Sequence, residues 1–311
     1  MNKDVSIFWF RRDLRLEDNV GLFYALSENE NVLPIFIFDK NILDKLEDKY
    51  DRRVHFILQA LEKIQLELTK IASSLLVFNS TPKEIFNKLL IEYKVKCVYV
   101  NHDYEPYAHL RDAEILELLK QYHVEFKTYK DQCIFEKKEV VKDDGTPYRV
   151  YTPFYRAWLA HGWRAPVGAP KNPNWVTPKK ADQNLPNWKL SNGITRQDAG
   201  EKAALARFKN FLKNSADDYG DARNIPGIEG TSRMSPHLRW GEIHPRTMLN
   251  VLGQNKGHEV YRKEIAWREF YADILFNNPH TETQYYAPQF SKMRYDKLGD
   301  KFKAWCEGKT G

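Results

Sequence analysis

The sequence predicts an α/β protein with an N-terminal, doubly wound parallel sheet (Rossmann-like), then a long connector, then an all-α domain. Three observations predict this order. Up to residue 130, β-branched and aromatic segments alternate with amphipathic segments. Prolines then crowd the chain, and from about residue 195 apolar residues recur at helical spacing with almost no strand pattern. Because 311 residues exceed what one hydrophobic core usually organises, we expect two domains.

Five strands are expected in the first part of the chain, where short segments are rich in β-branched and aromatic residues: 5–10, 32–38, 74–78, 95–100 and 124–129. Helices separate them, and the clearest covers residues 51–71, where apolar residues repeat every three or four positions. Strict alternation of strand and helix predicts a parallel sheet covered on both faces. Ligand sites of such sheets lie beyond the carboxyl ends of the strands.

Residues 131–194 are predicted to form a connector that wraps the first domain. A long regular element is not expected there, because prolines crowd it: Pro166, Pro170, Pro173, Pro178 and Pro186. Tryptophans give it apolar area to dock on its neighbours: Trp158, Trp163, Trp175 and Trp188. The expected domains are therefore 1–130 and 195–311, the second with helices near 196–214, 245–252, 257–277 and 297–306.

Composition excludes several classes of protein. The net charge is +6, and the positive excess lies after residue 130. The three cysteines are far apart in the chain, which suggests neither a disulfide framework nor a cysteine-rich zinc site and fits a reducing cytoplasm. No apolar segment approaches the roughly 20 residues of a membrane helix, and we see no secretory signal. The histidines have no metal-ligand spacing, so no metal site is expected.

A cluster of mixed charge lies where the first strand ends, in the segment FWFRRDLRLEDN at residues 8–19. Two interpretations are open. The segment is either a solvated loop with exposed ion pairs or a phosphate-binding loop at the carboxyl edge of the sheet. The absence of a G-x-G-x-x-G or P-loop motif makes a standard dinucleotide site or P-loop at this strand unlikely.

A second cluster lies between residues 219 and 248, where hydroxyl and guanidinium groups gather just before a proline that can begin a helix: Thr231, Ser232, Arg233 and Ser235. Tyr219 and Arg223 precede it. Hydroxyls, an arginine and the N–H groups of a helix start are what a phosphate or pyrophosphate requires. The alternative is an ordinary helix N-cap with a spare arginine.

A third cluster lies on the helix expected over 257–277. At about 100° per residue, one face carries Glu264, Trp267, Arg268 and Tyr271, with Tyr261 at its edge. Such a face can stack a flat heterocycle and hydrogen-bond its edge, as proteins do with an extruded base. The alternative is that these aromatic residues simply pack in the core.

Together these clusters resemble the DNA photolyase and cryptochrome family. The shared motifs are FRRDLRLEDN at 10–19, YRVYTPFYRAW at 148–158, the stretch 219–246, WREFY at 267–271 and WCEGKTG at 305–311. The resemblance implies an α/β domain that can hold an antenna chromophore and a helical domain that binds FAD. It is strongest to the enzymes that repair cyclobutane pyrimidine dimers, which extrude the dimer from DNA and split it with an electron from reduced, photoexcited FAD.

The resemblance also implies roles for individual residues. Glu264 would hydrogen-bond the dimer and Trp267 would pack on it, which makes these two the catalytic residues. Arg223 would contact the DNA backbone, and the DNA-binding stretch would comprise Glu264, Ile265, Ala266, Trp267, Arg268, Glu269, Phe270 and Tyr271. The FAD contacts would be Tyr219, Thr231, Ser232, Arg233, Met234, Ser235, Tyr261 and Arg268.

Three departures from the family pattern shape the remaining expectations. Tyr107 and Ala108 stand where folate-binding members carry an Asn-Glu pair, so the antenna is left unspecified among folate, deazaflavin and flavin types. Tyr295 stands where the outermost tryptophan of the electron relay would be. Family members continue well past residue 311, so we expect a truncated product or fragment that retains little or no FAD.

The expected partner is dimer-containing DNA, and the chain is expected to bind it as a monomer. No association with a membrane is expected. Two alternatives stay open: a cryptochrome-type blue-light photoreceptor and a non-functional fragment.

Overall fold

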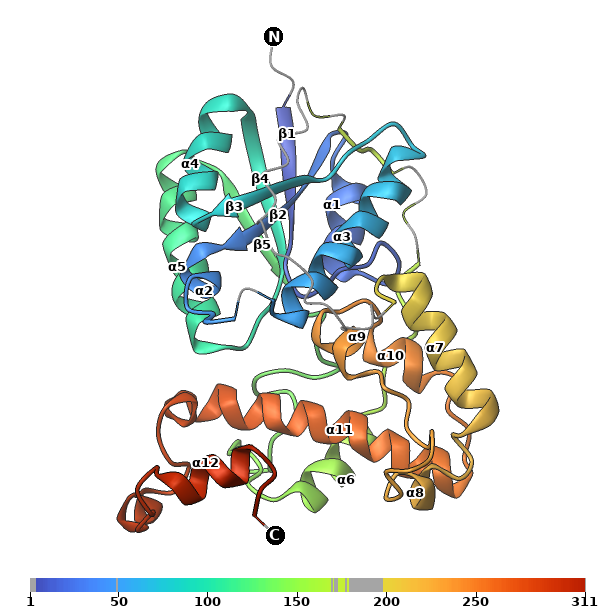
Figure 1. The fold of residues 1–311 in the computed structure, drawn as a ribbon. Coiled ribbons are helices and arrows are strands. Elements are labelled where there is room, and N and C mark those ends of the chain that lie inside the picture. The colour runs from blue at the N-terminus through green and yellow to red at the C-terminus, as the bar shows by residue number, and fades with distance from the viewer. Residues whose placement is uncertain are drawn as a thin grey trace.

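The computed structural model describes residues 4–48, 50–168, 170, 173–176, 178 and 198–310. Its first part is a five-stranded parallel sheet with helices on both faces, and its second part is helical (Figure 1). The elements of the first part are β1 (Asp4–Phe10), α1 (Val20–Glu28), β2 (Val32–Asp39), α2 (Lys40–Leu43), α3 (Arg52–Thr69), β3 (Leu76–Ser80), α4 (Pro82–Glu92), β4 (Lys94–Asn101), α5 (Pro106–Gln121) and β5 (Glu125–Tyr129).

The strand order is β3-β2-β1-β4-β5, and every neighbouring pair is parallel. This confirms the predicted α/β class and its parallel sheet. All five expected strands are present, within two residues of their predicted bounds, and the helix expected over 51–71 is α3. The order reverses between β1 and β4, and in doubly wound sheets ligands bind outside the carboxyl ends of the strands at that point.

Alternation along the strands divides the first part into two cores. Phe8 and Phe10 of β1 pack with α1 and α3 on one face of the sheet. Ile7 and Trp9 point to the other face, where α4 and α5 cover them. Because successive strand side chains point to opposite faces, a strand buried on both sides is mostly apolar, as β1 is from Ile7 to Phe10.

The second part consists of α6 (Tyr151–His161), α7 (Glu201–Asn214), α8 (Tyr219–Ala222), α9 (Ser235–Arg239), α10 (Pro245–Leu249), α11 (Lys256–Asn277), α12 (Asp300–Cys306) and the 3₁₀ turns η1 (Pro279–Glu282) and η2 (Pro288–Lys292). The four helices predicted after residue 195 correspond to α7, α10, α11 and α12, although residues 196 and 197 lie outside the described part. In Figure 1, α9 and α10 lie between the sheet and the long helix α11.

The predicted connector contains a helix that the sequence interpretation missed. Only a long regular element was excluded there, and the 11-residue helix α6 was not identified; the crowded prolines begin only after Gly162, where a φ of 63° ends the helix. Trp158 of α6 is completely buried and packs in the core of the helical part. Residues 151–161 therefore belong structurally to the second core.

A later piece of the connector docks on the sheet, as predicted. The backbone of Val32 at the start of β2 donates to the Asn174 carbonyl at 2.8 Å and accepts from the Val176 amide at 2.9 Å. Trp175 packs against the first core. Two other predicted connector residues, Pro186 and Trp188, lie outside the described residues.

The charged segment after β1 joins the two parts of the molecule. Arg15 is 2% exposed, pairs with the Asp131 carboxylate at 2.5 Å and donates to the Gly241 carbonyl at 2.8 Å. Leu14 donates its amide to the Trp240 carbonyl at 2.9 Å. The solvated-loop interpretation is wrong for Arg11 and Arg15, which are buried and pair with Asp112 and Asp131. Asp18 is also buried and pairs with Arg246 of the second part. The phosphate-loop interpretation stays a prediction.

Two further observations concern the described ranges only. No helix in them combines the length and the hydrophobicity that crossing a membrane requires. They also contain no group of three or more His, Cys, Asp or Glu side chains placed to hold a metal ion.

Candidate functional site

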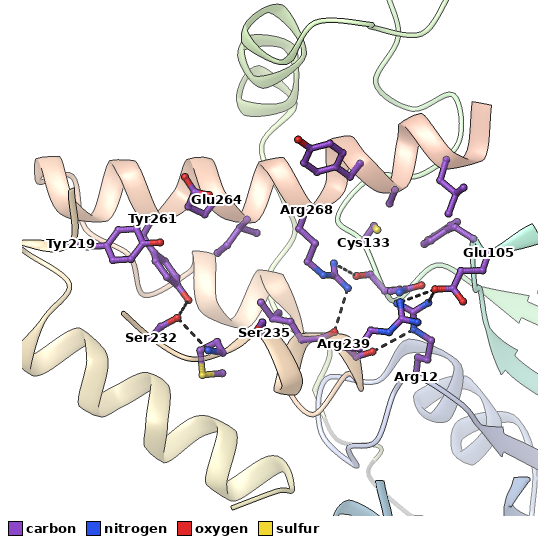
Figure 2. Close-up of a pocket in the computed structure, with 18 residues that line it drawn as sticks. Arg12, Glu105, Cys133, Tyr219, Ser232, Ser235, Arg239, Tyr261, Glu264 and Arg268 are labelled. Carbon is purple, nitrogen blue, oxygen red and sulfur yellow. Dashed lines mark hydrogen bonds and ion pairs between the residues drawn. The ribbon is translucent and has the colours of Figure 1, made fainter. Parts of the chain in front are cut away.

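A cavity of about 530 Å³ lies between α11, the segment 232–239 and the loops that follow β1, β4 and β5. Ligand pockets generally measure roughly 300–1,000 Å³. Figure 2 shows Tyr261, Glu264 and Arg268 projecting from α11, with Ser232 and Ser235 facing them and Arg12 and Glu105 at the sheet end. The cavity thus meets the sheet at the edge where the strand order reverses.

Helix α11 explains why these side chains converge. It begins at the N-cap Asn255, whose side chain accepts from the His258 amide, and it runs for 22 residues. Residues three and four apart share a helical face, and one such face lines the cavity: Tyr261, Glu264, Ile265, Arg268, Tyr271, Ala272 and Leu275.

The opposite face of α11 is anchored in the second core, and Ala266, Glu269 and Phe270 are at most 5% exposed. This corrects part of the predicted DNA-binding stretch, because buried side chains cannot meet DNA. Ile265 is also buried and faces the cavity. The predicted stretch is therefore reduced to Glu264, Trp267, Arg268 and Tyr271.

Glu269 fixes α11 against the connector. Its carboxyl oxygens accept from the Ile134 amide at 2.8 Å, the Phe135 amide at 2.7 Å and the Trp158 indole N–H at 2.8 Å. Desolvation outweighs these donors and raises the pKa of Glu269 to about 7. The sequence interpretation assigned this residue to DNA, but it positions the cavity-lining helix.

The raised pKa of Glu269 predicts a pH-dependent stability. Between about pH 4.5 and 7 the unfolded chain releases this proton while the folded chain retains it, so the contribution of Glu269 to stability falls as the pH rises. We expect the stability of Glu269→Gln relative to the wild type to improve from pH 5 to pH 8 in urea unfolding. Glu229→Gln, at an exposed carboxylate, should show no such change. An equal response of both variants would contradict the prediction.

An ion pair lies at the rim of the cavity. The Arg223 guanidinium, just after α8, donates to the Glu264 carboxylate of α11. The two side chains are 35% and 38% exposed, and the guanidinium also lies 5.7 Å from the centre of the Tyr219 ring. Tyr219 and Glu264 line the cavity, whereas Arg223 does not.

The predicted phosphate segment is only partly directed into the cavity. Ser232, Met234 and Ser235 line it, and Ser232 accepts a hydrogen bond from the Tyr261 hydroxyl at 2.9 Å. Thr231 and Arg233 are exposed and do not line it, and Arg233 pairs with Glu229 at 2.5 Å.

Helix α9 tests the alternative interpretation of this segment. Its N-cap is Met234, and no side chain makes a capping hydrogen bond there. The ordinary N-cap interpretation is therefore wrong for this helix start, and the phosphate interpretation stays a prediction.

Trp267 lies beside the cavity and does not line it. Its ring stacks on Tyr151 of α6, with ring centres 3.5 Å apart and planes 9° from parallel. The Tyr151 hydroxyl donates to the Lys263 carbonyl at 2.6 Å, which holds α6 along α11. The sequence interpretation did not assign Tyr151 to the site, although it quoted the motif that contains it.

The sheet side of the cavity was also missed, because residues were assigned to one domain at a time. Arg12, Tyr104, Glu105, Gln132 and Cys133 contribute to its lining. Arg268 donates to the Gln132 carbonyl at 2.9 Å. The buried Oε1 of Gln132 has no partner within the described residues and is an available acceptor in the wall of the cavity.

A second cavity of about 480 Å³ lies between α2, α3 and α9. Its floor is largely apolar, and Arg52, Arg53 and Arg239 lie at its lining. Ser235 and Arg239 line both cavities, so α9 separates them. A flat aromatic group with an anionic substituent matches this lining.

The predicted relay residue Tyr295 is 64% exposed. It belongs to a segment, residues 279–310, in which no residue is buried and which displays several large apolar side chains: Tyr285, Tyr286, Phe290, Met293, Leu298, Phe302 and Trp305. Its part in electron transfer stays a prediction.

Comparison with known proteins relates the chain to one family. Residues 6–173 match the family described as DNA photolyase, and residues 261–311 match the FAD binding domain of DNA photolyase. A protein of a Synechococcus species named deoxyribodipyrimidine photo-lyase is 29% identical, over 98% of this chain and 67% of its own length.

Solved structures agree with the sequence matches. An archaeal photolyase from Sulfolobus tokodaii, described with two FAD molecules and a novel light-harvesting cofactor, has a TM-score of 0.84 at 30% identity; the match covers 99% of this chain and 68% of that one. A bacterial class III photolyase from Agrobacterium tumefaciens has a TM-score of 0.81 at 26% identity, over 99% of this chain and 66% of that one. The chain thus spans about two thirds of the length of these relatives.

Proposed function

Because this chain belongs to the DNA photolyase family, we propose that it binds FAD in the cavity beside α11 and acts in the light-driven repair of cyclobutane pyrimidine dimers in DNA. The observation that carries the proposal is the position of Glu264. This carboxyl lines a cavity of hydroxyl, guanidinium and aromatic groups and also reaches the exposed rim. A group so placed can meet both a bound cofactor and a base extruded from DNA.

The lining of the cavity fits FAD. The Ser232 and Ser235 hydroxyls are donors for phosphate oxygens, and Tyr219 and Tyr261 offer aromatic surface to a flat ring. The unpartnered Gln132 Oε1 supplies an acceptor for an N–H group of a heterocycle. We propose that Ser232, Met234, Ser235, Tyr219, Tyr261 and Arg268 hold the cofactor. Thr231 and Arg233 are left out, because they do not face the cavity.

Reduced FAD supplies, when bound and illuminated, the electron that splits the dimer. The residues of this chain bind and orient the substrate. Arg223 contacts a backbone phosphate, and Trp267 and Tyr271 offer aromatic surface to the extruded bases. Glu264 hydrogen-bonds the polar edge of the dimer. We further propose that the partner is dimer-containing DNA, bound by a monomer.

The second cavity is the position we propose for the antenna chromophore. Its apolar floor and three arginines suit a flat chromophore that carries an anionic group. Tyr107 and Ala108 stand where folate-binding members carry an Asn-Glu pair. The Tyr107 hydroxyl donates to Asp39 at 2.5 Å, and Ala108 is buried. The choice among flavin, deazaflavin and folate types stays open.

A titration with FAD followed by illumination tests the function. We expect the 311-residue chain to bind added FAD weakly, with visible absorption bands, and to remove dimers from DNA under blue light after the flavin is reduced. A second chromophore would appear in the same spectrum. Neither FAD binding nor dimer loss, while a known photolyase repairs the same DNA in parallel, would contradict the proposal.

Glu264→Ala separates repair from cofactor binding. It should lower the repair yield by roughly tenfold, the value of one hydrogen bond to a charged group, and leave the FAD dissociation constant nearly unchanged. Equal losses of repair and FAD binding would mean that Glu264 supports only the structure of the cavity. Glu229→Ala, at an exposed carboxylate outside the cavity, serves as the control.

A further inference from the structure

We propose that Arg223 is a positioning residue that holds Glu264 in an ion pair until a DNA phosphate takes over its guanidinium. The inference rests on the proposed function, which gives Arg223 a phosphate contact and Glu264 a contact with the dimer. It adds that a DNA phosphate and the Glu264 carboxylate compete for the Arg223 guanidinium. Binding of the DNA backbone at Arg223 releases the carboxyl group that recognises the damaged bases.

The geometry places the pair at the boundary between the cavity and solvent. Glu264 projects from the cavity-lining face of α11, beside Tyr219 (Figure 2). Arg223 follows the short helix α8, which packs against α11, and lies outside the cavity lining. One member of the pair therefore faces the bound ligand, and the other faces the surface where DNA would arrive.

The pair is isolated from other ion pairs. Within the described residues, Glu264 is the carboxylate that pairs with Arg223, and no second cation pairs with Glu264. The Tyr219 ring lies beside the guanidinium and restricts its movement. The hydroxyls of Tyr151 and Tyr219, on the neighbouring helices α6 and α8, are titratable groups that sense the charge of Glu264. Loss of the arginine thus removes the salt-bridge partner of this carboxylate.

Competition follows from the chemistry of the two groups. The carboxylate of Glu264 is held by the Arg223 guanidinium, so it is not free to turn toward the dimer. Phosphate binds the planar guanidinium in a bidentate manner. An ion pair that is one third exposed holds its partners only weakly, so a phosphate can displace the carboxylate. The released carboxyl group is then free to hydrogen-bond the polar edge of the dimer.

Binding of undamaged duplex DNA to the 311-residue chain, measured by fluorescence anisotropy, tests the competition without requiring repair. Glu264→Gln frees Arg223 and should tighten this binding by up to about fivefold, the range expected for an exposed ion pair. Arg223→Gln should weaken binding, and in that background Glu264→Gln should give no further gain. In an Arg223→Lys background, Glu264→Gln should again tighten DNA binding in part, because lysine keeps the positive charge.

A matched control separates release of the arginine from the change of net charge. Glu229→Gln also removes one negative charge and frees an exposed arginine, Arg233. Equal tightening by Glu229→Gln and Glu264→Gln would overturn the inference, as would a gain from Glu264→Gln that persists without Arg223. Circular dichroism melting of each variant verifies that it is folded.

The outcome is distinguishable from failure of the proposed function. If the wild type binds undamaged and dimer-containing duplexes equally, the assignment of dimer recognition fails, while the competition for Arg223 is still decided by the undamaged duplex. If the dimer is preferred but the gain of Glu264→Gln does not depend on Arg223, the inference alone fails. Absence of measurable binding to either duplex overturns both.

Discussion

Arg15→Met is expected to destabilise the chain by about 3–5 kcal/mol, because it leaves a buried carboxylate without its partner. Arg15 is 2% exposed, and Asp131, with which it pairs, is 1% exposed at its side chain. The substitution also removes donors from the Asp18 and Gly241 carbonyls. Urea unfolding followed by circular dichroism measures the loss.

Two further variants test the cause of that loss. Arg233→Met breaks a surface pair whose partners are 62% and 77% exposed, and it should cost about 1 kcal/mol or less. Adding Asp131→Asn to Arg15→Met should recover part of the stability, because the buried charge disappears. A cost for Arg15→Met no greater than that for Arg233→Met would show that the buried pair does not secure the junction.

Gly241→Ala is expected to cost about 3 kcal/mol or more. Gly241 has a φ of 65°, and a Cβ there would lie 2.1 Å from the Arg12 carbonyl oxygen and 2.7 Å from the Asp13 Cα. These atoms belong to the backbone of the loop after β1, which cannot rotate aside as a flexible side chain would. The variant must therefore combine left-handed strain with separation of the two segments.

The control for this prediction is Gly145→Ala. Gly145 has a similar φ of 77°, but no heavy atom lies within 4 Å of the position of its added Cβ. It should show the conformational cost alone, about 1 kcal/mol. If the two variants lose the same stability in urea unfolding, the close approach at Gly241 contributes nothing.

Local patterns predicted the sheet and α11 well, because the information lies in neighbouring residues. The buried strands are mostly apolar, and the face with Tyr261, Glu264 and Arg268 follows from helical spacing. Helix α6 was missed for the same reason. A local cluster of prolines was extended to residues 151–161, which precede most of it and form α6.

Roles that depend on distant partners could not be read from the sequence. Glu269 sits within a motif that the resemblance assigned to DNA, yet its partners are Ile134, Phe135 and Trp158, more than 100 positions earlier. Asp18, after β1, likewise pairs with Arg246 in the second part of the molecule. A burial pattern alone does not say which distant donor satisfies a buried carboxylate.

The junction at Arg15 also sets an order of folding during synthesis. Arg15 donates to the Gly241 carbonyl, which lies 226 positions later in the chain. Asp18 accepts from Arg246, which lies 228 positions later. The loop that ends the first strand therefore cannot complete its contacts until most of the 311 residues have left the ribosome. Closing so long a loop is slow. We expect the early α/β segment to pass through a stage in which Arg15 and Asp131 have only part of their final partners, so the molecule becomes one cooperative unit late in synthesis.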